Sequence, residues 1–359
     1  MANKYNDYYP NIAIPPGVTL KEYLEDVGMS QAELAKRTGI TTKHISEIIN
    51  GKAPISQDTS LKLENVLGIP ASFWNNLEMN YQETKARLDA EKEIQDEMAI
   101  ASEIPYNEIA KNGWISPTKD PRHKVVNLRS YFGVASLRFI PDVHEAAFAA
   151  FRTADQEKVS RLALATWLRQ GEIKASEVKT EPFDKKKLMA SIEAFRSLTL
   201  LSAEEFEPRL KDLCAACGIA LVFVPHLSKT YAHGATRWLS PQKSMIQLSL
   251  RYKYADIFWF TFFHELAHII LHGKKEIFIE LSGNKDVMEN EADSFASKTL
   301  IPYKEYENFI RGTISKSTII DFSKKVNVHP CIVVGRLQHD KIISYSEFSE
   351  LRPRFTWAS

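Results

Sequence analysis

The stretch from Trp259 to Gly273 reads WFTFFHELAHIILHG and places three histidines and a glutamate in a run of aromatic and aliphatic residues. An uncompensated ionisable group is costly in such surroundings, so these residues need a common partner. On an α-helix, the imidazoles of His264 and His268 lie on one face, about one turn apart. Two neutral imidazoles at that spacing can bind one Zn²⁺, so the HExxH pattern predicts a zinc site.

Glu265 lies between these two histidines in the sequence and is the predicted catalytic residue. Beside a metal ion, its carboxylate can take a proton from the attacking water and pass it to the leaving amine. A catalytic zinc ion has three protein ligands and one open position. The pattern therefore predicts a zinc endopeptidase whose third ligand lies outside HExxH.

We expect the third ligand on a second helix over residues 287–300. Glu289 and Asp293 are four residues apart and share one face of that helix. We assign Glu289 as the ligand and Asp293 as the acceptor of the second N–H of a ligand histidine. Glu291, rotated by about 200°, is the alternative ligand or a solvated charge. His272 is expected to be a helix-end residue or to support the ligands from outside the coordination sphere.

From about Thr199 to its end, the chain resembles the ImmA/IrrE family of metallopeptidases. The resemblance rests on HGATRWLSPQKSMIQLSLRYKYADIFWFTFFHELAHIILH, ENEADSFASKTLIP and IIDFSKKVNVHPCIVVGRLQHD. It implies that His264, His268 and Glu289 bind zinc. It also implies that the domain cleaves or regulates DNA-binding repressors of the Xre type, in phage, mobile-element or stress circuits.

Near the start of the chain, GMSQAELAKRTGITTKHISEIINGK (residues 28–52) predicts a helix-turn-helix. Ser30 is expected to cap a helix over 31–38, with Glu33 as its capping-box partner. Gly39 ends that helix, and a second helix runs to Asn50. Polar side chains around the second helix can meet base edges or phosphates, and the predicted DNA contacts are Gln31, Thr42, Lys43, His44, Ser46, Glu47, Asn50 and Lys52.

Residues 17–81 resemble the HigA-type branch of the Xre-like repressors, through GVTLKEYLEDVGMSQAELA, ISEIINGK and LENVLGIPASFWNNLEMNYQ. The resemblance implies sequence-specific binding to an operator near the protein's own gene, usually as a dimer. Residues 1–80 carry seven Lys or Arg and nine Asp or Glu, so the domain is not basic. Phosphate contacts supply much of the affinity for DNA, and a helical bundle kept for protein contacts is the alternative.

The whole chain has 359 residues and a net charge of +1, which gives no global attraction to nucleic acid or to a membrane. We predict an α+β, mostly helical fold with three parts: a helix-turn-helix domain (1–80), a helical middle region (81–200) and a zincin-like domain with a small sheet (201–359). Three cysteines make no disulfide framework, and the lone pair Cys214 and Cys217 is expected to pack in a core. A cytoplasmic location is expected.

Two functions follow from these patterns. The first is a DNA-binding, zinc-dependent endopeptidase, a homodimer that acts on a repressor, a toxin or itself. The second is a non-proteolytic regulator or antitoxin of the HigA type, in which the zinc domain is a sensor or scaffold. The intact HExxH pattern favours the first, because a structural zinc site usually fills its fourth position with a protein ligand.

Overall fold

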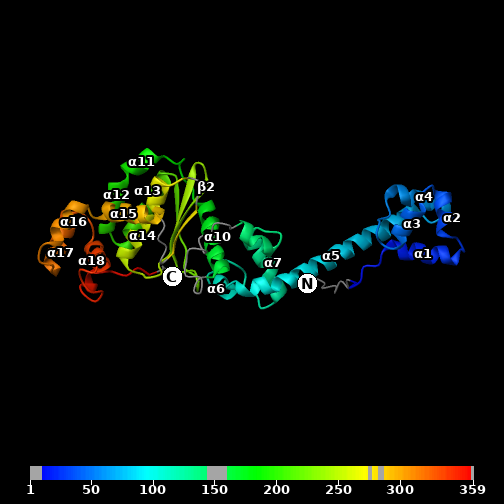
Figure 1. Cartoon of the computed structure of the whole chain (residues 1–359), viewed down its shortest axis with the longest axis horizontal. Coiled ribbons are helices and arrows are strands. Elements are labelled where there is room, and N and C mark those ends of the chain that lie inside the picture. The colour runs from blue at the N-terminus through cyan, green and yellow to red at the C-terminus, as the bar shows by residue number, and fades with distance from the viewer. Residues whose placement is uncertain (1–9, 144–159, 274–276, 282–286, 357–359) are drawn as a thin grey trace, which may run out of the picture. The chain divides into compact units, whose positions relative to one another are not determined.

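The computed structural model describes residues 10–143, 160–273, 277–281 and 287–356. It divides into two compact units, Met1–Met98 and Ala99–Ser359 (Figure 1). The 33-residue helix α5 (Ala71–Glu103) contributes to both ranges. The domain limits at residues 80 and 200 stay predictions.

The described part of the first unit is helical, with α1 (Pro16–Asp26), α2 (Gln31–Thr38), α3 (Thr42–Ile49) and α4 (Gln57–Leu67) packed beside the start of α5. These short helices share one apolar cluster, which consists mainly of Leu20, Leu24, Leu34, Ile45, Ile48, Leu63 and Trp74. All of these side chains are almost completely buried, so this small core explains why four short helices hold together.

The helix-turn-helix agrees with the prediction to within one residue, because local capping fixes its bounds. The Ser30 hydroxyl accepts the backbone N–H of Glu33 at 3.1 Å, and Gly39 ends α2 at φ 71°. The Thr41 hydroxyl then accepts the N–H of His44 at 3.2 Å and starts α3. The capping box itself is not formed: the Glu33 carboxylate accepts a hydrogen bond from Arg37 Nε at 2.7 Å instead.

The second unit contains a mixed four-stranded sheet of order β1-β3-β2-β4. Its strands are β1 (Ile219–Phe223), β2 (Ala232–Ser240), β3 (Lys243–Leu248) and β4 (Ile277–Leu281). β1 is parallel to β3, and the other two pairs are antiparallel. The apolar run IALVFVP and the alternating run MIQLSL (245–250) predict strands at the places of β1 and β3, whereas the sequence analysis does not predict β2 and β4.

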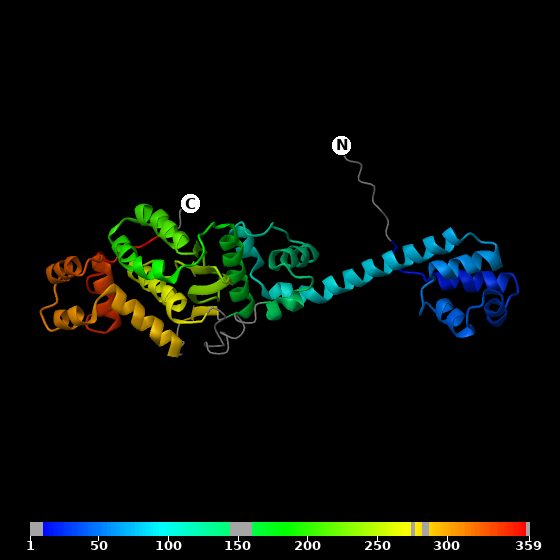
Figure 2. The same ribbon diagram turned by 90° about the horizontal axis from the view of Figure 1, so that it is seen from above.

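Helices cover both faces of this sheet (Figures 1 and 2). α14 (Ala255–Leu271) packs on one face, with α13 (Ala203–Ala216) beside β1 and α15 (Val287–Leu300) along α14. α10 (Arg161–Glu177) lies on the other face, where Trp167 Nε1 donates to the carbonyl of Val224 at 3.2 Å. Among the residues that the structure describes, the other α-helices of this unit are α6 (Tyr106–Lys111), α7 (Pro121–Phe132), α8 (Ile140–Val143), α11 (Lys185–Ala190), α12 (Ile192–Ser197), α16 (Tyr303–Ile310), α17 (Lys316–Lys325) and α18 (Pro330–His339).

α14 is the centre of the larger core and is buried along almost its whole length. Its phenylalanines and Trp259 pack against α12, α13 and the C-terminal helices, which explains why the helix is apolar on every side. Cys214 and Cys217 are buried free cysteines in the same cluster, as expected. None of the helices among the described residues is long and apolar enough to cross a lipid bilayer.

Candidate metal centre

Three side chains from α14 and α15 converge inside the second unit. The donor atoms of His264, His268 and Glu289 all lie within 4.8 Å of one another. The two Nε2 atoms are 3.0 Å apart, and the Glu289 carboxylate lies 3.1 Å from the first ring and 3.7 Å from the second. All three residues are buried, with relative exposures of 1%, 0% and 8%.

The donors of this group fit a metal ion. Two imidazole nitrogens that face each other at 3.0 Å with a carboxylate beside them form the His₂Glu set known from catalytic zinc sites. Burial, followed by the neighbouring His264 and His272, lowers the pKa of His268 to about 2. This ring is therefore neutral at physiological pH, and a neutral imidazole is the form that binds a metal.

Asp293 holds the first histidine from outside the group. Its Oδ1 lies 2.9 Å from His264 Nδ1, so the carboxylate accepts that N–H when Nε2 is left free for a metal. Asp293 and Glu289 are one turn apart on α15 and reach the two nitrogens of one ring. This contact is the one that the four-residue spacing predicts.

A longer chain of hydrogen bonds supports the second histidine. His268 Nδ1 lies 2.9 Å from His272 Nδ1, and His272 Nε2 lies 3.1 Å from the carboxylate of Glu291. One set of tautomers satisfies every contact: His268 donates to His272, and His272 donates to Glu291. Glu291 thus lies outside the three-residue group, and its carboxylate contacts His272 while 57% of its side chain stays exposed.

The glutamate of HExxH faces the sheet. Glu265 is completely buried, and its Oε2 accepts a hydrogen bond from the Thr236 hydroxyl at 2.6 Å. A Cβ atom on Gly234 would lie only 2.5 Å from Glu265 Oε1, so glycine allows β2 to pass this carboxylate closely. Neither residue of β2 was singled out from the sequence, because the strand itself was not recognised.

One face of the second histidine is covered by β4. The Phe278 ring stacks on His268 with centroids 4.2 Å apart and an angle of 14° between the planes. A cavity of about 250 Å³ lies one helical turn from His264, lined by Phe260, Thr261 and Ser297 among others. The site therefore has an apolar wall and a nearby space, both of which favour a ligand shielded from water.

None of the predicted DNA contacts in the first unit is buried. Thr42, Lys43, Asn50 and Lys52 are exposed, and Gln31, His44, Ser46 and Glu47 are partly exposed. Glu47 lies 3.8 Å from Lys43 and 3.7 Å from His44, so the carboxylate offsets positive charge on this helix. Asn50 caps α3, and its amide donates to the carbonyl of Ser46 at 2.7 Å. The buried face consists of the three isoleucines of α3, which leaves the polar face open to a partner.

Comparisons with known families agree with these two units. A helix-turn-helix family model matches residues 20–74, and the model of the IrrE N-terminal-like domain, of peptidase family M78, matches residues 229–337. Virulence-associated protein I of Dichelobacter nodosus is 34% identical over 101 residues, which are 28% of this chain and 87% of the relative.

The chain belongs to the Xre-type helix-turn-helix family and carries an IrrE N-terminal-like domain. The first unit thus carries a domain of a DNA-binding family, and the second carries a domain similar to those of peptidase family M78, whose members are typically metal-dependent. The uncharacterised HTH-type transcriptional regulator YddM of Escherichia coli K12 is 29% identical, over 22% of this chain and 80% of its own length.

Solved structures similar to this chain include antitoxin and antidote proteins. The HigA-family addiction module antidote protein of Coxiella burnetii is 36% identical, covering 24% of this chain and 94% of its own, with a TM-score of 0.22. Pseudomonas aeruginosa antitoxin HigA, solved with the higBA promoter, is 29% identical over 24% of this chain and 95% of its own, with a TM-score of 0.23.

Proposed function

We propose that the chain is a DNA-binding, zinc-dependent endopeptidase that cuts a regulatory protein, which is a repressor, a toxin or the chain itself. The convergence of His264, His268 and Glu289 within 4.8 Å on the HExxH helix carries this proposal. The match to the IrrE N-terminal-like domain supports it, because that family is one of metallopeptidases. The helix-turn-helix family match supports operator binding by a homodimer.

Each residue has a role in this proposal. Zinc bound by the three ligands would polarise the scissile carbonyl and make water a better nucleophile. Glu265 takes a proton from the attacking water and gives it to the leaving amine. Thr236 orients that carboxylate through its 2.6 Å hydrogen bond, and Asp293 fixes the tautomer of His264. The apolar side chains around them exclude bulk water.

Co-expression with the products of neighbouring genes tests this function. Mass spectrometry should find fragments of one partner, and they should disappear when zinc is removed with a chelator and return when zinc is added back. Intact partners at every zinc concentration, together with an uncut chain, would count against the peptidase.

A regulator without proteolysis is the second candidate. The complete burial of Glu265 against Thr236 favours it, because a base must meet water to act. In that case, the metal centre would be a sensor or scaffold that stabilises the second unit. Repression and toxin neutralisation would then persist in a chain that binds zinc and cuts nothing.

The α3 face makes a separate prediction about DNA. Lys43→Ala with Asn50→Ala is expected to weaken operator binding by about tenfold or more, because a good base contact contributes about 1–3 kcal/mol. Lys21→Ala is the matched control, since Lys21 is exposed on α1 and pairs only loosely with Glu25 at 3.8 Å. A mobility-shift titration with the region upstream of the gene measures the effect. If wild type bound the operator and a random duplex equally well, this result would contradict sequence-specific DNA binding.

The hydrogen-bond chain from His268 makes a prediction about metal affinity. Glu291→Gln removes the negative acceptor of His272 and is expected to weaken zinc binding by about tenfold; mutations of such outer partners typically cost 10–100-fold. Glu307→Gln on α16, where the glutamate side chain is 37% exposed, should leave the affinity unchanged. Competition with a fluorescent zinc chelator measures both. Equal affinities of the two variants for zinc would show that the hydrogen bonds from His268 to Glu291 do not affect metal binding.

A further inference from the structure

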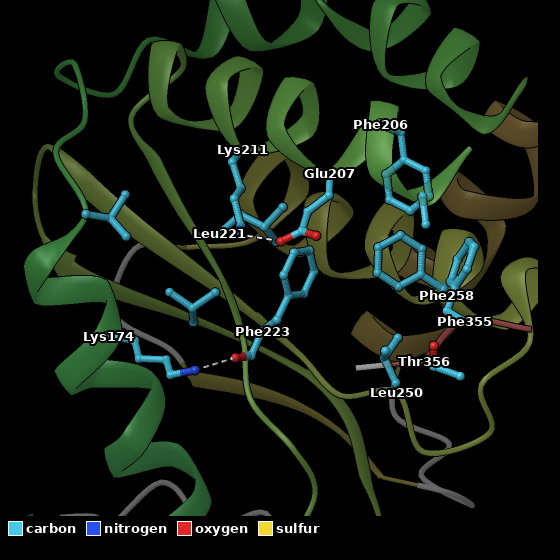
Figure 3. Close-up of a pocket in the computed structure, with 13 residues that line it drawn as sticks. Lys174, Phe206, Glu207, Lys211, Leu221, Phe223, Leu250, Phe258, Phe355 and Thr356 are labelled. Carbon is cyan, nitrogen blue, oxygen red and sulfur yellow. Dashed lines mark hydrogen bonds and ion pairs between the residues drawn. The ribbon is translucent and has the colours of Figure 1, made fainter. Parts of the chain in front are cut away.

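One cavity of the second unit lies apart from the metal centre. It has a volume of about 450 Å³ and includes none of the three proposed ligands or Glu265. Figure 3 shows it along β1, between side chains of α10 and α13. The floor is the strand itself, through Leu221, Val222 and Phe223.

One edge of β1 is not paired with a strand in the described part of the chain. In the sheet order β1-β3-β2-β4, β1 is terminal, and its partner β3 lies on one side. The Gly218 carbonyl accepts Ser244 N–H at 3.1 Å, and Val224 N–H donates to β3 at 3.0 Å. Because backbone groups alternate in direction along a parallel strand, those of Leu221 and Phe223 point to the cavity.

One backbone group on this edge of β1 is bound by a side chain instead of by a neighbouring strand. Lys174 on α10 donates to the Phe223 carbonyl at 2.9 Å, the contact drawn in Figure 3. Leu221 is only 3% exposed, and no hydrogen bond from the described residues outside the β1–β3 ladder reaches its backbone. Buried backbone groups normally have a partner, so this edge is prepared for another strand.

The side chains that line the cavity indicate which kinds of side chain an added strand would need. Phe206, Phe258 and Phe355 form an aromatic cluster at one end, with ring centroids 5.3–5.5 Å apart. Lys174 has no carboxylate within ion-pair distance among the described residues, whereas Lys211 is paired with Glu207 at 2.6 Å. Burial is the main cause of the lowered pKa of Lys174; Lys211 lowers it further, and Glu177 opposes the shift. An acidic group of a bound segment would give this partly buried ammonium a close counter-charge.

We propose that this groove binds a short extended segment of a partner protein, which adds to β1 as a further parallel or antiparallel strand. An apolar side chain of the segment fills the phenylalanine cluster, and an acidic residue pairs with Lys174. Main-chain hydrogen bonds give the affinity, and the two side-chain contacts give the specificity. This docking site would bring a regulatory protein to the second unit independently of the metal centre.

Peptide binding to the full-length chain tests the proposal. The probe is a fluorescent library of hexapeptides that alternate Val, Leu or Phe with polar residues and carry one Asp, together with Asn versions. The Glu265→Gln chain is used, so cleavage cannot remove the probe. Asp peptides should bind about tenfold more tightly than their Asn partners, because a hydrogen bond between two charged groups is stronger than one to a neutral amide. Failure of every library member to bind would overturn the proposal.

A backbone substitution separates strand pairing from apolar contact. In the best peptide, N-methylation of every second residue should abolish binding, and N-methylation of the residues between them should leave binding unchanged. The reason is that only alternate N–H groups face β1. Equal effects at successive residues would refute strand addition. This test needs no change to the protein, so it does not depend on the folding of a variant.

Two protein variants locate the site. Phe223→Pro removes an outward N–H on an edge strand, where proline is tolerated, and should weaken binding at least about tenfold more than Phe223→Ala, which keeps the N–H. Lys174→Met should remove the preference for Asp over Asn and leave binding of Asn peptides unchanged. If Phe223→Pro instead converts a dimer to a monomer and the peptides do not bind, the edge is occupied by a second copy, and the proposal is wrong.

Discussion

Replacing Glu265 with Gln is expected to reduce peptide hydrolysis by about 10²–10⁴-fold while one zinc ion stays bound. Gln has the same shape, and its side-chain oxygen can still accept the 2.6 Å hydrogen bond from Thr236. The amide, however, cannot take a proton from water. Because the position is fully buried and the neighbouring strand approaches closely at Gly234, a larger side chain would change the packing as well.

The matched comparison is Glu289→Gln. This change removes a proposed ligand, so it should lower zinc occupancy and hydrolysis together, whereas Glu265→Gln lowers hydrolysis alone. Initial rates on a cleaved partner, with zinc content measured on the same samples, distinguish the two. Wild-type rates in the Glu265→Gln chain would rule out the general-base role, and loss of zinc in that chain would place the residue among the ligands.

The second large effect is on stability. Arg352 binds Asp256 at the start of α14 through two hydrogen bonds of 2.9 and 2.7 Å, and both side chains are 8% exposed. Arg352→Met is expected to lower the free energy of unfolding by about 3–5 kcal/mol, because it leaves a buried carboxylate without its cation. Urea denaturation followed by tryptophan fluorescence measures the loss. A loss below about 1 kcal/mol would contradict this role for the pair.

The same pair makes a pH prediction with a definite sign. Burial raises the pKa of Asp256 above its unfolded value, and Arg352 partly offsets the shift. The folded carboxyl therefore holds its proton more tightly, so this group favours folding at low pH and costs stability as pH rises through its folded pKa. Without the arginine, the ionised Asp256 destabilises the folded state more. The loss of unfolding free energy in Arg352→Met should therefore be smaller at pH 5 than at pH 7. In the double variant Asp256→Asn with Arg352→Met, this loss should be small at both pH values.

Local patterns were enough to predict the elements that local interactions determine. The bounds of α2 and α3 follow from Ser30, Gly39 and Thr41, whose contacts span only a few residues. The apolar helix around HExxH and the acidic helix after it were predicted for the same reason. The i, i+4 spacing of Glu289 and Asp293 also predicted which atoms they approach, since one helix face meets one ring.

Features that depend on tertiary neighbours were missed. β2 contains AHGATRWLS, whose small residues carry little strand signal, yet its Thr236 meets Glu265 across 29 positions of sequence. The role of Glu291 depends on His272, which leaves the helix at its C-cap and turns its ring toward α15. The open edge of β1 follows only from the strand order. The partners in these contacts are not at a regular spacing in the sequence, so a single sequence does not predict them.

The central claim is that one metal ion is held by two rings of α14 and one carboxylate of α15. Anomalous diffraction at the zinc absorption edge, from crystals of the full chain grown with zinc, tests it most directly. We predict one peak at about 2.0–2.2 Å from His264 Nε2, His268 Nε2 and an oxygen of Glu289. The absence of a peak between the rings, or a peak whose neighbours do not include Glu289, would contradict the account.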